Sequence, residues 1–228
     1  MSQFKTTTQI IKVLKEIDRR DYEIPKEEYI DNQIDVLGFN FNTYENNFVT
    51  KFNEIYSRFE FLGEIPNRLE LQRQLQIPKK YMYTDCRDDK VIKAYEKLKN
   101  KYDDQVRNHA EFETIPDFFI HKDQNDRNPE NQILIIEFKT EFNLPENRFM
   151  WDFFKLNLYL EKYNFQTACF VCINNSRQRI EDYLFTYLEN NHYQTSKKNK
   201  LQIILQEGYD SEIECFSFLK FVRLTGHY

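Results

Sequence analysis

Apolar residues in the first 107 positions recur at the three- and four-residue spacing of helices. This pattern predicts amphipathic helices over residues 7–20 and 44–61. Pro66 suits the first turn of a third, shorter helix, which must end before Pro78. A short strand is expected at residues 81–84. A further helix over residues 88–107 carries one stripe of hydrophobic residues and another of lysines.

After Pro116 the pattern changes to alternating strands and helices. Strands are expected at 117–121, 133–140, 167–173 and 201–205, helices at 146–163 and 177–190, and an edge strand or hairpin at 213–224. Two of these strands are almost entirely apolar, as central strands covered on both faces are. The sequence therefore predicts an α/β fold with a mixed central sheet flanked by helices. We expect a helical N-terminal region, residues 1–80, packed on a core of residues 81–228.

Composition limits the class of protein. The 228 residues are 40% hydrophobic and 16% aromatic, which suits one folded domain and excludes disorder. The four glycines lie too far apart for a dinucleotide-binding or P-loop motif, and neither a His-Glu-x-x-His motif nor a serine-hydrolase elbow occurs. The net charge of −5 argues against a strongly basic coat-like nucleic-acid binder. It does not argue against an enzyme that meets nucleic acid along one groove.

We expect neither a membrane span nor a secretory signal. Apolar runs such as residues 133–136 are far too short to cross a bilayer, and the first six residues contain no hydrophobic run. Cys169 and Cys172 lie three apart on one expected strand, so they should face opposite sides of the sheet as buried, reduced core residues. These features predict a cytoplasmic protein without a membrane partner.

Two charged residues, Glu137 and Lys139, interrupt the apolar strand at 133–140. They are two positions apart, so both side chains leave the same face, and charges there are costly to bury unless they pair or bind a metal. Asp117 begins the preceding strand, and antiparallel pairing would bring it beside Glu137. The alternative is that Asp117 ends a turn while Glu137 and Lys139 pair with each other at a sheet edge.

The chemistry of these three residues suits hydrolysis of a phosphodiester. Two carboxylates that share a site repel each other unless a cation lies between them. Oxygen ligands without Cys or His favour Mg²⁺ or Mn²⁺. Lys139 would then orient or deprotonate a metal-bound water, or stabilise the charge of a phosphate.

The same residues carry a resemblance to a known superfamily. Ile-Pro-Asp-Phe-Phe-Ile-His-Lys at 115–122, followed by Asn-Gln-Ile-Leu-Ile-Ile-Glu-Phe-Lys at 131–139, resembles the PD-(D/E)XK nucleases of restriction-endonuclease-like fold. It is similar to bacterial members in which PDxxxH precedes an apolar ExK strand, and it covers residues 116–174. The resemblance implies an αβββαβ core and a metal-dependent DNA endonuclease, in which Asp117 and Glu137 hold the metal and Lys139 acts on the attacking water. It also suggests a bacterial or phage defence setting, that is, antiviral defence.

The superfamily often adds a glutamate from the helix before these strands as another metal ligand. Glu45, Glu54 and Glu70 compete for this role, and Glu45 lies where the sequence is most similar to the family's helix opening. Lys155 would lie near the phosphate, with Asp152 one turn earlier to hold it. For each of these residues, a solvated helix position is the alternative.

Lysines elsewhere are candidates for contacts with the nucleic-acid backbone. Lys93 and Lys97, on the lysine stripe of the 88–107 helix, are expected to face phosphates, as are Lys197, Lys198 and Lys200. The alternative for the stripe is an ordinary solvated helix face.

Three functions stay open. The first is a DNA endonuclease, for which a homodimer or higher oligomer would supply the two active sites of a double-strand cut. The second is an RNA endonuclease of similar fold. The third is a catalytically silent nuclease-like module that binds nucleic acid or a protein.

Overall fold

The computed structural model describes residues 3–22, 41–64, 72–75, 88–102, 116–122 and 128–226. Its helices and strands, in chain order, are α1 (Gln3–Leu14), α2 (Arg19–Tyr22), α4 (Phe41–Phe61), β1 (Gln72–Leu75), α5 (Asp89–Tyr102), β2 (Phe118–His121), β3 (Gln132–Lys139), α6 (Glu146–Lys162), β4 (Thr167–Ile173), α7 (Arg177–Glu189), the 3₁₀ helix η4 (Lys198–Lys200), β5 (Leu201–Gln206), β6 (Glu214–Ser217) and α8 (Phe218–Thr225).

The strands form one mixed sheet in the order β1-β2-β3-β4-β5-β6. The central strands β3, β4 and β5 run parallel, whereas β1, β2 and β6 are antiparallel to their neighbours. From α4 to β4 the elements follow the expected αβββαβ order, with α5 inserted between β1 and β2. The predicted α/β fold, with a mixed sheet flanked by helices and a helical N-terminal region, is confirmed.

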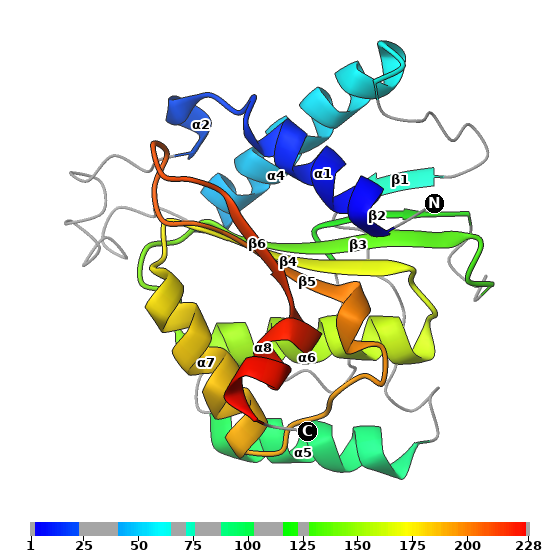
Figure 1. Ribbon diagram of the computed structural model, residues 1–228, viewed down its shortest axis with the longest axis vertical. Helices are drawn as coiled ribbons and strands as arrows, with labels where there is room; N and C mark the ends of the chain where they lie inside the picture. The colour runs from blue at the N-terminus through cyan, green and yellow to red at the C-terminus, as the bar shows by residue number, and fades with distance from the viewer. Residues whose placement is uncertain are drawn as a thin grey trace.

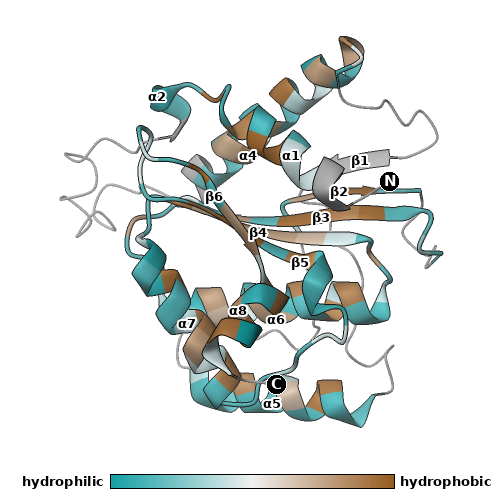
Figure 2. Ribbon diagram, viewed as in Figure 1, coloured by the Kyte–Doolittle hydropathy of each residue, from teal (hydrophilic) through white to brown (hydrophobic). Residues whose placement is uncertain are grey.

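Helices cover both faces of this sheet. Figure 1 shows α1 and α4 on one face and α6, α7 and α8 on the other, with α5 on the side of α6 that faces away from the sheet. The strand β3 is buried along its whole length, and Figure 2 shows hydrophobic residues concentrated along it. This burial on both faces explains its almost continuous apolar sequence.

Successive side chains of β3 point to opposite faces of the sheet, so the strand contributes to a hydrophobic core on each face. Phe138 packs with α4, where its ring centroid lies 4.9 Å from that of Phe52. Phe138 and Phe52 belong to one hydrophobic core cluster, on the α4 side of the sheet, and Ile135 belongs to another, on the α6 side. In β4, Cys169 and Cys172 are buried free thiols in these two different clusters, as their three-residue spacing predicts.

Two predictions of secondary structure are wrong. The helix expected after Pro66 does not include residues 72–75, which form β1 and pair with β2, Arg73 opposite Ile120. The tail expected as an edge strand or hairpin is a strand only over β6 and then becomes α8. The Ser217 hydroxyl caps α8 by accepting a hydrogen bond from the backbone N–H of Lys220 at 3.2 Å, and Gly226 ends the helix at a φ of 76°.

The first helix is also shorter than expected, because α1 ends at Leu14 and α2 begins at Arg19. The strand expected at 81–84 and the boundary expected near residue 80 lie outside the described residues. None of the helices in the described parts of the chain combines the length and hydrophobicity that a membrane crossing requires.

Candidate active site

The antiparallel pairing of β2 with β3 positions Asp117. Phe118 lies opposite Ile136, so Asp117, one residue earlier, sits beside the end of β3. Its Oδ2 accepts a hydrogen bond from the backbone N–H of Phe138 at 2.7 Å. The side chain is buried at the level of Glu137 and Lys139, as the sequence predicts.

Glu137 and Lys139 leave the face of β3 that α6 covers. Lys139 Nζ lies 3.0 Å from Asp152 Oδ2, and Lys155 Nζ lies 3.5 Å from Glu137 Oε1. Asp152 and Lys155 also pair with each other, one turn apart on α6. All four groups are more than four-fifths buried, so the alternatives of a sheet-edge pair and of a solvated Lys155 do not describe the structure.

Glu45 reaches the same place from the opposite layer. Because Lys139 is the last residue of β3, the beginning of α4 can contact it, and Lys139 Nζ donates to both Glu45 oxygens at 3.2 Å. Glu54 lies farther along α4, where it is exposed and pairs with Lys51. Glu70 lies outside the described residues. Glu45 is therefore the described glutamate of α4 that joins the site.

These side chains are called the carboxylate–lysine cluster below. Its members are Glu45, Asp117, Glu137, Lys139, Asp152 and Lys155. They come from α4, from the start of β2, from β3 and from α6, and so from three layers of the molecule.

Burial and mutual repulsion make three of the carboxylates reluctant to ionise. Burial raises the pKa of Glu137 well above its usual range, and the charges of Asp117 and Asp152 raise it further although Lys155 opposes them. Burial likewise raises the pKa of Asp117, against the effects of Lys139 and the Phe138 N–H. The pKa of Glu45 is raised to about 7, chiefly by burial and despite Lys139.

Asp152 and the two lysines behave in the opposite way. Burial disfavours the ionised form of Asp152, but Lys139 and Lys155 outweigh it and lower its pKa to about 2. Burial also disfavours the ammonium forms of the lysines, yet Asp152 and the neighbouring glutamates raise the pKa of both above the usual lysine value. Both lysines are therefore ammonium groups at neutral pH.

The cluster contains the carboxylate oxygens that a divalent cation would need as ligands. Glu137 Oε1 is buried and accepts no hydrogen bond from the described residues, and the charge of Asp117 adds to burial in raising the pKa of both Glu45 and Glu137. Carboxylate oxygens that repel one another in a buried site are the ligands that Mg²⁺ and Mn²⁺ prefer. No three Asp, Glu, His or Cys side chains in the described ranges are already arranged as a preformed metal-binding group.

The loop after β3 is held by two asparagines at the end of β4. Asn174 Nδ2 donates to the Thr140 carbonyl at 3.0 Å, and Asn175 Nδ2 donates to the Glu141 carbonyl at 2.7 Å. Asn174 adopts a φ of 62°, a left-handed conformation that Asn tolerates well. These bonds fix the backbone directly after Lys139.

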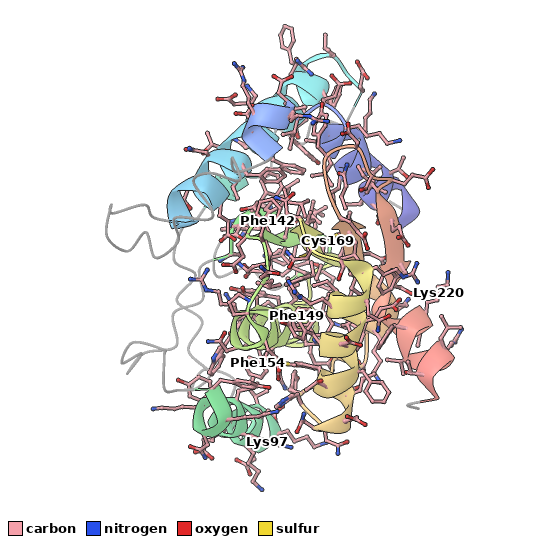
Figure 3. The ribbon with its side chains drawn as sticks, turned by 90° about the vertical axis from the view of Figure 1, so that its left-hand side faces the viewer. Lys97, Phe142, Phe149, Phe154, Cys169 and Lys220 are labelled. Carbon is pink, nitrogen blue, oxygen red and sulfur yellow. The ribbon has the colours of Figure 1, made fainter. Side chains whose placement is uncertain are left out.

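The structure does not bring the other predicted lysines to the cluster. Lys93 is exposed on α5, and Lys97 donates to the Asn190 carbonyl just after α7. In Figure 3 Lys97 lies on the lowest helix, well away from Phe142, which is three residues after Lys139. Lys197 donates to the Leu160 carbonyl at 2.9 Å, near the far end of α6, and Lys198 and Lys200 lie beside it in η4.

The contact between Asp152 and Lys139 is the part of the cluster that sequence reasoning missed. The signal was present, because Asp152 is three residues after Phe149 and four before Leu156, on the apolar stripe of α6. Glu141 was also missed. It is buried next to the cluster and accepts from Arg148 Nη1 at 2.8 Å.

Comparisons with protein-family models, with curated proteins and with solved structures found no match to this chain.

Proposed function

We propose that this chain is a divalent-metal-dependent endonuclease that hydrolyses phosphodiester bonds of DNA. The observation that carries the proposal is the convergence of Asp117, Glu137 and Lys139 at one end of β2 and β3, with a buried Glu137 oxygen that accepts no hydrogen bond from the described residues. The resemblance of residues 115–139 to bacterial PD-(D/E)XK nucleases adds support for this chemistry and for DNA as the substrate.

Asp117, Glu137 and Glu45 would hold the cation, Mg²⁺ or Mn²⁺. A bound divalent cation supplies an acidified water and neutralises charge on a phosphate. These three carboxylates would supply the oxygen ligands. Burial raises the pKa of each of them, so their ionised forms are unfavourable in the buried site unless a cation compensates the charge.

Lys139 acts in this proposal as an ammonium group. Its raised pKa, which results from four surrounding carboxylates that outweigh burial, disfavours a role as the base that removes a proton from water. Its three N–H donors instead orient the attacking water or stabilise charge on the phosphate. Lys155, the second ammonium of the cluster, would stand near the same phosphate.

The proposal also includes a cytoplasmic location, a homodimeric state and a role in defence. The buried free thiols of Cys169 and Cys172 support a reducing compartment such as the cytoplasm. A homodimer would provide the two sites of a double-strand cut, and defence against phage is the setting that the resemblance favours.

The direct test is cleavage of supercoiled plasmid and of single-stranded RNA, each with Mg²⁺ or with EDTA. Wild type should cut the plasmid only with Mg²⁺, and Lys139→Ala should reduce the rate at least 100-fold, as loss of transition-state stabilisation of about 3 kcal/mol would. Lys220→Ala, an exposed lysine on α8, is the matched control and should cut like wild type.

Other results would change the proposal. Cleavage of RNA but not of plasmid would identify the substrate as RNA while preserving the chemistry. Cleavage of neither substrate, with intact binding of nucleic acid, would support a catalytically silent binding module.

A further inference from the structure

Asp152 differs from the other carboxylates of the carboxylate–lysine cluster in what it contacts. Each of its oxygens meets a different lysine: Oδ2 lies 3.0 Å from Lys139 Nζ, and Oδ1 pairs with Lys155 Nζ. The side chain is only 12% exposed. Both oxygens of Asp152 are therefore already engaged by ammonium groups inside the core.

Asp117 and Glu137, the two carboxylates on the sheet side of the cluster, keep oxygens that are less well compensated. Asp117 accepts a backbone N–H through Oδ2. Glu137 Oε1 accepts no hydrogen bond among the described residues, although Lys155 Nζ lies 3.5 Å away. The carboxylate charge that is left to attract a cation is therefore that of Asp117 and Glu137, on the sheet side of the cluster, and not that of Asp152.

We infer that Asp152 is a positioning residue that holds Lys139 and Lys155 between β3 and α6, and that it is not a metal ligand. This inference rests on the proposed function in taking a divalent cation as the ligand of the cluster. When all groups are ionised, four carboxylates and two ammonium groups leave a charge of −2, which one divalent cation balances.

Loss of the Asp152 charge would release the two lysines. Lys139 and Lys155 repel each other, and within the cluster their remaining ion-pair partners are Glu45 and Glu137. The ammonium groups would then compete with a cation for those same carboxylates. Asp152 therefore acts on metal binding through the lysines, without touching the metal.

Calorimetric titration with Mn²⁺ tests this with a charge-balanced pair of variants. Asp152→Asn should weaken Mn²⁺ binding about tenfold, and Lys155→Met alone should strengthen it. The double variant has the wild-type charge and should return to within about threefold of wild-type affinity. If the double variant binds as weakly as Asp117→Asn, then Asp152 is a ligand and the inference is overturned.

A second measurement needs no metal. In wild type, the ¹H–¹⁵N signals of the Lys139 and Lys155 ammonium groups should be observable because pairing and burial slow their exchange with water. Lys139→Met and Lys155→Met assign these signals, Asp152→Asn should lose both, and Asp152→Glu should recover part of the intensity by restoring the charge. Circular dichroism checks that each variant is folded.

The two measurements separate the inference from the proposed function. Unchanged ammonium signals in folded Asp152→Asn would overturn the positioning role. Signals that depend on Asp152 in a wild-type protein that binds no Mn²⁺ would uphold that role and refute the metal-dependent activity.

Discussion

At the scale of single residues, the buried charges of the carboxylate–lysine cluster lower the free energy of unfolding. Burying a carboxylate without full compensation opposes folding, and Glu137 is 1% exposed with an oxygen that has no hydrogen-bond partner among the described residues. A chain selected only for stability would place an apolar or neutral side chain on this strand. The charge is expected to persist because function requires it.

This cost predicts a gain in stability when the charge is removed. Glu137→Gln should raise the free energy of unfolding by about 1–2 kcal/mol at pH 7.5 in EDTA, because the amide pays no ionisation cost in the core. The same variant should lose metal-dependent cleavage. Urea denaturation measures the stability, with the exposed Glu54→Gln as the control that should change neither property.

A lower stability for Glu137→Gln than for wild type would contradict this account. It would show that the ion pair with Lys155 contributes more to folding than the burial of the carboxylate costs.

At the scale of elements, neighbouring strands were predictable and the contacts between layers were not. Asp117, Glu137 and Lys139 follow from one antiparallel pair, because the two-residue period fixes which side chains share a face. Glu45 was only one of three candidates, since its choice depends on where α4 crosses the sheet. The contact is made across 94 residues of sequence.

The two wrong elements have different physical causes. Gln72–Leu75 is short and mostly polar, so its strand conformation results from backbone pairing with β2 rather than from a hydrophobic pattern. In α8, Phe218, Phe221 and Val222 have helical spacing and are buried, but the adjoining strand residues concealed that period.

The packing of α5 near the end of α7 gives a prediction for pH dependence. His192, just after α7, is 3% exposed, and neither ring nitrogen has a hydrogen-bond partner among the described residues. Its ring packs on Tyr187. Burial, together with the nearby charges of Lys97 and Lys101 on α5, lowers its pKa to about 4.

A lowered histidine pKa means that the unfolded chain takes up this proton first as the pH falls. The contribution of the neutral His192 to the free energy of unfolding is complete above pH 6.5 and is lost progressively as the pH falls toward 4, by about 3 kcal/mol. His192→Gln should remove this part of the pH dependence in urea denaturation between pH 7 and 4. Parallel curves for wild type and the variant would show that His192 does not titrate on unfolding.

At the scale of the whole molecule, the cluster exists only where three layers meet. One carboxylate comes from α4 on one side of the sheet, and an Asp–Lys pair comes from α6 on the other side (Figure 1). The sheet itself supplies two residues of β3 and Asp117, which directly precedes β2. The core clusters that hold these layers together lie on both faces of β3 and β4. The sheet thus serves as a rigid support that fixes the charged groups at the end of its internal strand β3.

The proposed metal-dependent nuclease site at this junction is best tested by the initial rate of plasmid cleavage in Mg²⁺, measured for wild type and for Asp117→Asn. This substitution keeps the size of the side chain and removes the charge of a proposed metal ligand. We expect cleavage by wild type, at least a 100-fold lower rate for Asp117→Asn, and a wild-type rate for Asp210→Asn, which changes an exposed carboxylate. Equal rates for wild type and folded Asp117→Asn would contradict the proposal.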